Sequence, residues 1–227
     1  MSTKTVMAID QPVTIAAGDV VLSGDLTLPE GASGLVVFVH GSGSSRFSSR
    51  NRWVAGELVR AGLGTLLMDL LTPEEEVEDD RTRRLRFDIP MLAGRVVATL
   101  RWLSADSRTS HLRYGCFGAS TGGGAALIAA AQSPDLVGAV VSRGGRPDLA
   151  GPLLREVRAP TLLIVGGADP VVLDLNQDAY RQLGCEKRLE VVKGATHLFE
   201  EPGALDQVAR LAQEWFSTHL AGSAPGH

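Results

Sequence analysis

The sequence contains little cysteine, few aromatic residues and no excess of positive charge. Two cysteines among 227 residues, Cys116 and Cys185, exclude a disulfide framework, and the first ten residues lack the apolar core of a signal peptide, so we expect a cytoplasmic protein. The formal net charge of −4 offers no broad neutralisation of phosphates, so no nucleic acid partner is expected. No stretch approaches the roughly 18 consecutive apolar residues of a membrane span, so no membrane partner is expected either.

The composition that remains is typical of a globular enzyme. Hydrophobic residues make up 44% of the chain and charged residues 21%, which is enough apolar material for one buried core. We predict a single domain over residues 1–220 and a flexible tail over residues 221–227, where Gly, Ser and Pro are concentrated. A small molecule is the expected partner, and a homodimer is compatible with the composition, which does not specify one.

Short apolar runs alternate with longer helical stretches along most of the chain. The run at residues 35–40 is apolar almost without a break, as in a strand covered on both faces. Repeated alternation of strand and helix predicts parallel βαβ crossovers. The predicted strands cover residues 13–16, 20–28, 35–40, 64–70, 113–119, 137–142, 160–165 and 188–192, the first two forming an antiparallel pair. The predicted helices cover residues 50–61, 90–104, 121–132, 149–157, 171–183 and 203–220.

These elements predict a three-layer α/β fold, in which a mostly parallel eight-stranded sheet carries helices on both faces. Residues 72–86 are dense in charge of both signs and are predicted to form an exposed excursion. Only residues 143–160 separate the sixth strand from the seventh, which is too short for a cap domain, so an open site is expected. Ligands bind outside the carboxyl ends of parallel strands, so the turns after the strands should hold the chemistry.

The turn after the fifth strand has the pattern Gly118-Ala119-Ser120-Thr121-Gly122. A serine nucleophile on a sharp strand-to-helix turn needs neighbours without a Cβ, and glycine at both flanks meets this requirement. Ser120 is therefore the predicted nucleophile. The turn after the third strand, His40-Gly41-Ser42-Gly43, is predicted to complete an oxyanion hole from the backbone N–H groups of Ser42 and Thr121. His40 is interpreted as a structural residue that bonds to the backbone of this loop.

The predicted acid and base follow the last two strands. Asp169 comes after the seventh strand and His197 after the eighth, so the chain order is Ser, Asp, His, as expected for a nucleophile placed on such a turn. The imidazole would take the serine proton, and the carboxylate would fix the tautomer of the imidazole. Asp69, at the end of the fourth strand, and Asp148, after the sixth, are the alternatives for the acid. The other histidines lie before a strand or near the end of the chain: His111, His219 and His227.

Several residues near these turns are candidates for substrate binding. Arg143 and Arg146 follow the sixth strand, and an arginine fork suits a carboxylate or phosphate. Pairing with nearby acidic residues, Asp148 and Glu156 among them, is the favoured interpretation of both arginines. Phe199 is a further candidate on the grounds of its place in the last loop. Three more apolar residues are candidates for an acyl pocket on the same grounds: Phe47, Phe87 and Leu198.

With these motifs the sequence resembles the α/β-hydrolase superfamily, and more closely its dienelactone hydrolase-like group. The matching pieces are the His40 loop, the Ser120 turn, and the turns Gly166-Gly167-Ala168-Asp169 and Gly194-Ala195-Thr196-His197. The resemblance implies a carboxylic ester hydrolase that uses neither a metal nor an organic cofactor. Authentic dienelactone hydrolases carry a cysteine nucleophile, so Ser120 disfavours dienelactone as the substrate and favours general esterase chemistry. Similar bacterial hydrolases also occur joined to phosphoribosyltransferase domains.

The function expected from the sequence is that of a serine hydrolase which cleaves small carboxylic esters through an acyl-enzyme. The same Ser-Asp-His set would also serve an acyltransferase, a thioesterase or a peptidase. A non-catalytic binding protein of the same fold is the alternative from a different class.

Overall fold

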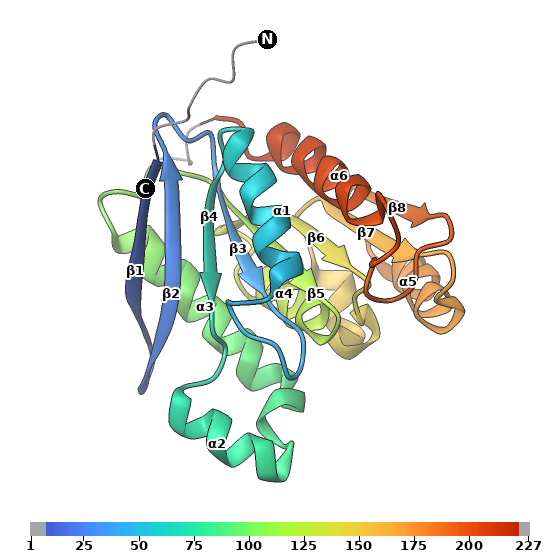
Figure 1. Ribbon diagram of the computed structural model, residues 1–227, viewed down its shortest axis with the longest axis horizontal. Helices are drawn as coiled ribbons and strands as arrows, with labels where there is room; N and C mark the ends of the chain where they lie inside the picture. Colours follow the sequence, from blue (N-terminus) through green and yellow to red (C-terminus); the bar gives the residue numbers. More distant parts are fainter. Residues whose placement is uncertain (1–7, 223–227) are drawn as a thin grey trace.

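The computed structural model describes residues 8–222, which are built around one eight-stranded sheet (Figure 1). The order of strands across the sheet is β1-β2-β4-β3-β5-β6-β7-β8. β1 and β2 are antiparallel to each other, β2 is antiparallel to β4, and the remaining pairs are parallel, which confirms the predicted sheet. The strands are β1 (Ala8–Ala17), β2 (Val20–Pro29), β3 (Leu35–Val39), β4 (Gly64–Met68), β5 (Tyr114–Ala119), β6 (Val137–Arg143), β7 (Thr161–Gly166) and β8 (Lys187–Val192).

Helices cover both faces of this sheet and make three layers. The helices are α1 (Ser49–Arg60), α2 (Pro73–Thr82), α3 (Ile89–Ala105), α4 (Thr121–Gln132), α5 (Pro170–Gln182) and α6 (Ala204–His219), with 3₁₀ segments η1 (Leu85–Phe87) and η2 (Pro147–Glu156). α1 and α6 pack together on one face, whereas α3, α4 and η2 pack on the other (Figure 1). None of these helices, over the residues described, has the length and apolar character needed to cross a membrane.

The central strands are buried on both sides, which explains their unbroken apolar sequence. Every side chain of β3 and β5 is buried. Successive side chains of a strand point to opposite faces, so Phe38 and Phe117 pack under α1 and α6, with ring centroids 4.9 Å apart. Val37 and Cys116 face α3 and α4 instead. This two-sided core holds the carboxyl ends of the parallel strands at one edge of the sheet.

The start of the first strand differs most from the bounds expected from the sequence. β1 begins at Ala8, five residues before the predicted strand, because it pairs residue for residue with β2 as far as Pro29. The connection from β6 to β7 contains only η2, which confirms that no cap domain is inserted there. The predicted tail at residues 221–227 lies outside the described residues from residue 223 onward.

The largest difference concerns the charged stretch at residues 72–86, which was predicted as a solvated excursion. It contains the helix α2, which projects below the sheet in Figure 1. The helix begins with a capping box, in which Thr72 Oγ1 accepts from the Glu75 N–H and Glu75 Oε2 accepts from the Thr72 N–H. Glu75 is also ion-paired with Arg95 of α3. The spacing Thr-x-x-Glu with Pro73 at the first turn was the signal for this helix.

A buried carboxylate ends the same excursion. Asp79 is only 1% exposed, accepts hydrogen bonds from the N–H groups of Leu85 and Arg86, and is ion-paired with the Arg86 guanidinium. The prediction of an exposed excursion therefore holds for most of residues 72–86. Asp79, the one buried residue of α2, is the exception, because its carboxylate closes the turn between α2 and η1.

Candidate active site

Ser120 lies on a strained turn between β5 and α4. Its backbone has φ 52° and ψ −125°, a conformation that costs an L-residue energy and that is typical of a nucleophile raised above the sheet. The turn is possible because its flanks have no side chains. A Cβ on Gly118 would lie 2.6 Å from the carbonyl oxygen of Gly122, and a Cβ on Gly122 would lie 2.5 Å from the carbonyl oxygen of His40. Both distances are far inside van der Waals contact.

Gly122→Ala is expected to destabilise the protein by about 3 kcal/mol, because the new methyl group would meet rigid backbone of the His40 loop rather than a mobile side chain. Gly94→Ala is the matched control. Gly94 lies in the interior of α3, and a Cβ there meets nothing within 4 Å, so this change is expected to stabilise the helix by up to about 1 kcal/mol. Urea unfolding monitored by circular dichroism measures both values. Equal unfolding midpoints for the two variants would contradict this account of the turn.

His197 and Asp169 meet Ser120 at the carboxyl edge of the sheet. The distance from His197 Nε2 to Ser120 Oγ is 3.3 Å, and the distance from His197 Nδ1 to Asp169 Oδ2 is 2.8 Å. An ionised carboxylate can only accept, so Nδ1 carries the proton and Nε2 is left as an acceptor for the serine hydroxyl. The imidazole side chain is 38% exposed, which leaves it open to a ligand. The structure thus brings together the three side chains that the sequence predicted.

The turns after β7 and β8 are bonded to each other and so place the Asp169 carboxylate beside the His197 imidazole. The Ala168 N–H donates to the Ala195 carbonyl at 2.9 Å, which ties the turn after β7 to the turn after β8. Asp169 also caps α5, because its Oδ1 accepts from the Val172 N–H at 3.4 Å. One carboxylate oxygen therefore orients His197 while the other fixes the start of the helix.

The alternative acids are engaged elsewhere. Asp69 is ion-paired with Arg46 and accepts from its backbone N–H at 2.8 Å. Asp148 makes two hydrogen bonds to Arg146, of 2.8 and 2.7 Å. Of the three candidate acids, Asp169 is therefore the one whose carboxylate contacts His197.

His40 has the structural position expected for it. Its Nε2 accepts from the Leu70 N–H at 3.1 Å, and its Nδ1 bonds to the Gly41 carbonyl at 2.9 Å. Burial lowers the pKa of His40 below the ordinary histidine value, so the ring stays neutral and can accept at Nε2. The ring therefore joins the loop after β3 to the end of β4.

The two predicted oxyanion donors lie next to each other, and one of them is already engaged. Thr121 is the first residue of α4, where backbone N–H groups have no partner within the helix. The Ser42 N–H donates to the hydroxyl oxygen of Thr121 at 2.8 Å. A substrate oxygen must therefore share or replace this acceptor before it can bond to Ser42. The sequence predicted a role for the backbone of Thr121 alone. The structure shows that its hydroxyl also contacts the oxyanion loop.

Two cavities open on either side of the Ser42 loop. The smaller, of about 230 Å³, is lined by Ser120, His197, Leu198, Arg143 and Arg50 among others. The larger, of about 590 Å³, lies between this loop and α2 and is lined in part by Phe47. Sequence reasoning missed Arg50, although its place in the first turn of the helix after the oxyanion loop was a usable signal.

The other candidates for substrate contact lie away from both cavities. Phe199 is 1% exposed and packs in the core under Arg143, with its backbone in the left-handed region at φ 56°, so its ring is turned inward and does not reach the pocket. Phe87 is exposed at the end of η1 and lines neither cavity. Arg146 is bonded to Asp148, as the favoured interpretation predicted, and is outside the smaller cavity.

A sheet with this strand order, carrying a strained serine after its fifth strand, has the architecture of an α/β hydrolase. Residues 22–219 match the model of the dienelactone hydrolase family, and the chain belongs to that family.

Relatives of known structure share this fold. The crystal structure of dienelactone hydrolase from Anabaena variabilis is 59% identical, with a TM-score of 0.93 over 94% of this chain and 99% of that chain. Est1E from Butyrivibrio proteoclasticus is 15% identical, with a TM-score of 0.76 over 92% of this chain and 98% of that chain, a likeness that shows the fold alone.

A curated relative from Mycobacterium tuberculosis strain H37Rv carries the provisional name phosphoribosyl transferase Rv0571c. It is 58% identical over 216 residues, which are 95% of this chain and 48% of the relative. The chain therefore spans about half the length of the curated relatives that it matches.

Proposed function

We propose that this chain is a serine hydrolase that cleaves small carboxylic esters through an acyl-enzyme on Ser120. The observation that carries the proposal is the series of hydrogen bonds from Ser120 through His197 to Asp169. A serine hydroxyl is a weak nucleophile until a neighbouring base takes its proton, and the imidazole is within reach to do so.

In the proposed reaction, Ser120 Oγ attacks the ester carbonyl carbon while His197 Nε2 takes the hydroxyl proton. The carbonyl oxygen becomes an oxyanion that accepts from the N–H groups of Thr121 and Ser42, the second of which exchanges its bond to the Thr121 hydroxyl for one to the substrate. His197 then gives its proton to the departing alkoxide, and the alcohol leaves. The same imidazole then deprotonates a water that attacks the acyl carbon. The bond from that carbon to Ser120 Oγ breaks, His197 returns the proton to Oγ, and the acid leaves.

Two features favour small substrates. The cavity at Ser120 has a volume of about 230 Å³, which is below the usual range for pockets that enclose drug-sized ligands. No cap domain is inserted between β6 and β7, so a long acyl chain would find little apolar surface to bury against there. We therefore expect p-nitrophenyl acetate and butyrate to be better substrates than the octanoate.

Transfer of the acyl group to an acceptor other than water, or from a thioester or peptide, would use the same residues. The name of the Mycobacterium tuberculosis relative describes a protein about twice as long as the stretch that it shares with this chain. The hydrogen-bonded residues Ser120, His197 and Asp169 are suited to acyl transfer and not to phosphoribosyl transfer.

A fluorophosphonate probe is expected to label the protein at Ser120 alone, because the probe reacts with serine hydroxyls activated by a base. Intact-mass and peptide mass spectrometry would locate the label. Prior treatment with iodoacetamide is the control for a cysteine nucleophile. Burial raises the pKa of Cys116 to about 12 and also raises the pKa of Cys185, so neither thiol should react readily and labelling should be unchanged. An unlabelled protein, or a label on another residue, would contradict the proposed function.

A further inference from the structure

Arg143 is a buried cation with no acidic partner among residues 8–222. It ends β6, is 7% exposed, and lines the smaller cavity together with Ser120 and His197. No ion pair or side-chain hydrogen bond reaches its guanidinium, and its Nε is buried without a partner. The favoured interpretation from the sequence, pairing with a nearby acid, holds for Arg146 but is wrong for Arg143.

Such a group is costly to keep, because a buried charge normally needs a partner charge or several hydrogen bonds. Burial lowers the pKa of Arg143 to about 10, and the nearby positive charge of Arg50 adds to this effect. The ring of Phe199, 5.7 Å from the guanidinium carbon, provides a cation–π contact that offsets part of the cost. Among the described residues, no group accepts a hydrogen bond from this guanidinium.

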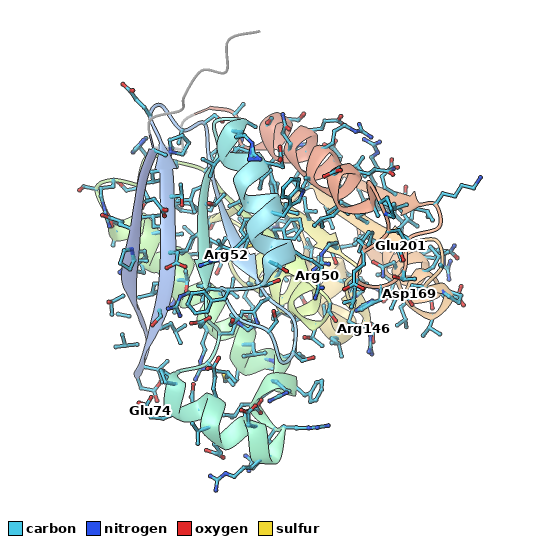
Figure 2. All side chains as sticks on the ribbon, viewed as in Figure 1. Arg50, Arg52, Glu74, Arg146, Asp169 and Glu201 are labelled. Atoms are coloured by element: carbon cyan, nitrogen blue, oxygen red, sulfur yellow. The ribbon has the colours of Figure 1, made fainter. Side chains whose placement is uncertain are left out.

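Arg50 brings a second positive charge to the same cavity from the first turn of α1 (Figure 2). Its Nη1 is 3.2 Å from Glu200, whose side chain is largely exposed, and its Nε is buried without a partner. No acidic residue lines this cavity in the part of the chain that the structure describes. The larger cavity differs in this respect, since it is lined by four carboxylates: Asp69, Glu76, Asp79 and Asp80.

The position of Arg143 ties this positive charge to the reacting serine. Arg143 pairs with Ala119 in the ladder between β5 and β6, and the Ser120 N–H donates to the Arg143 carbonyl at 3.2 Å. Because Arg143 and Ser120 also line the same cavity of about 230 Å³, an anion bound by the guanidinium there would lie close to the carbonyl carbon that Ser120 attacks.

We propose that Arg143 and Arg50 form a subsite for a carboxylate carried by the substrate, a few bonds from the scissile ester carbonyl. The preferred substrates would be half-esters of short dicarboxylic acids. A planar carboxylate matches the donor fork of a guanidinium and supplies the missing negative charge. This inference rests on the proposed ester hydrolysis, to which it adds the charge of the substrate.

The test compares two substrates of similar size, mono-p-nitrophenyl glutarate, which is anionic, and p-nitrophenyl butyrate, which is neutral. In the unchanged protein we expect kcat/KM to be at least tenfold higher for the glutarate. In Arg143→Met it should fall about 30-fold for the glutarate and less than threefold for the butyrate, because a charge-assisted hydrogen-bond pair is lost from one substrate only. Arg146→Met is the matched control, since Arg146 lies in the same loop but is bonded to Asp148, and it should leave the ratio unchanged.

Binding of glutarate to the Ser120→Ala protein separates this inference from the proposed function, because it requires no turnover. Isothermal titration should detect binding that Arg143→Met and Arg50→Met each weaken at least tenfold and that Arg146→Met leaves intact. If Arg143→Met failed to fold, Arg50→Met would provide the same comparison. An unaltered substrate ratio in Arg143→Met, or glutarate binding that is absent or indifferent to both arginines, would overturn the subsite. Absence of all ester turnover together with normal glutarate binding would instead overturn only the proposed function.

Discussion

Ser120→Ala is expected to lower kcat for p-nitrophenyl acetate by at least about 10⁴-fold. The change removes the hydroxyl that lies 3.3 Å from His197 Nε2, while the backbone donors at Ser42 and Thr121 remain. The residual rate should reflect the oxyanion hole and substrate binding alone. Steady-state kinetics with the chromogenic ester would measure the loss, and the fluorophosphonate label should disappear with it.

Ser44→Ala is the matched control for this substitution. Ser44 lines the same cavity as Ser120, but it is not part of the hydrogen-bond series to His197. Its removal should change kcat less than threefold. Both variants should unfold at the urea concentration of the unchanged protein, within error, which excludes misfolding as the cause of the loss. Ester turnover that survives Ser120→Ala would mean that another group is the nucleophile.

The sequence predicted that Ser120, Asp169 and His197 lie close together, because each one follows a strand whose apolar run is easily recognised. The carboxyl ends of parallel strands share one edge, so Ser120, Asp169 and His197 had to lie near one another once the strands had been identified. The glycines at 118 and 122 added a steric requirement that few other turns meet.

Contacts that depend on side-chain direction were harder to predict. Arg143 and Arg146 stand three residues apart near the same acids, yet Asp148 bonds to Arg146 and leaves Arg143 facing the cavity. Sequence distance does not reveal which of two neighbouring arginines receives a partner. The bond from the Ser42 N–H to the Thr121 hydroxyl joins residues 79 positions apart, and no local pattern indicates it.

The inward ring of Phe199 and the helix α2 within the charged excursion were both missed, for different reasons. An aromatic residue two positions after His197 suggested a pocket wall, but the positive φ at Phe199 turns its ring into the core. The charge density of the stretch around Asp79 suggested solvent, although a capping box within it marked a helix. In the first case the missing information was a backbone conformation, which the sequence did not specify. In the second case the capping-box sequence Thr72-x-x-Glu75 was present, but the high charge of the stretch was given more weight than this signal for a helix.

Asp169→Asn is expected to lower kcat by about 10³- to 10⁴-fold with little loss of stability. Asparagine has nearly the same shape and is an equally good helix cap, so the bond to the Val172 N–H at the start of α5 can persist. Its amide N–H₂ can donate to His197 Nδ1, however, and that bond favours the tautomer with its proton on Nε2. The imidazole then faces the Ser120 hydroxyl as a donor and cannot take its proton.

Comparison with Asp169→Ala separates the two roles of this carboxylate. The alanine variant loses the helix cap as well and should be about 1 kcal/mol less stable than the asparagine variant in urea, whereas both should have similarly low kcat. Asp174→Asn, a change of the same kind on the exposed side of α5, should alter neither quantity. If Asp169→Asn kept near-normal turnover while Asp169→Ala lost both turnover and stability, the carboxylate would matter as a cap of α5 rather than as the partner of His197.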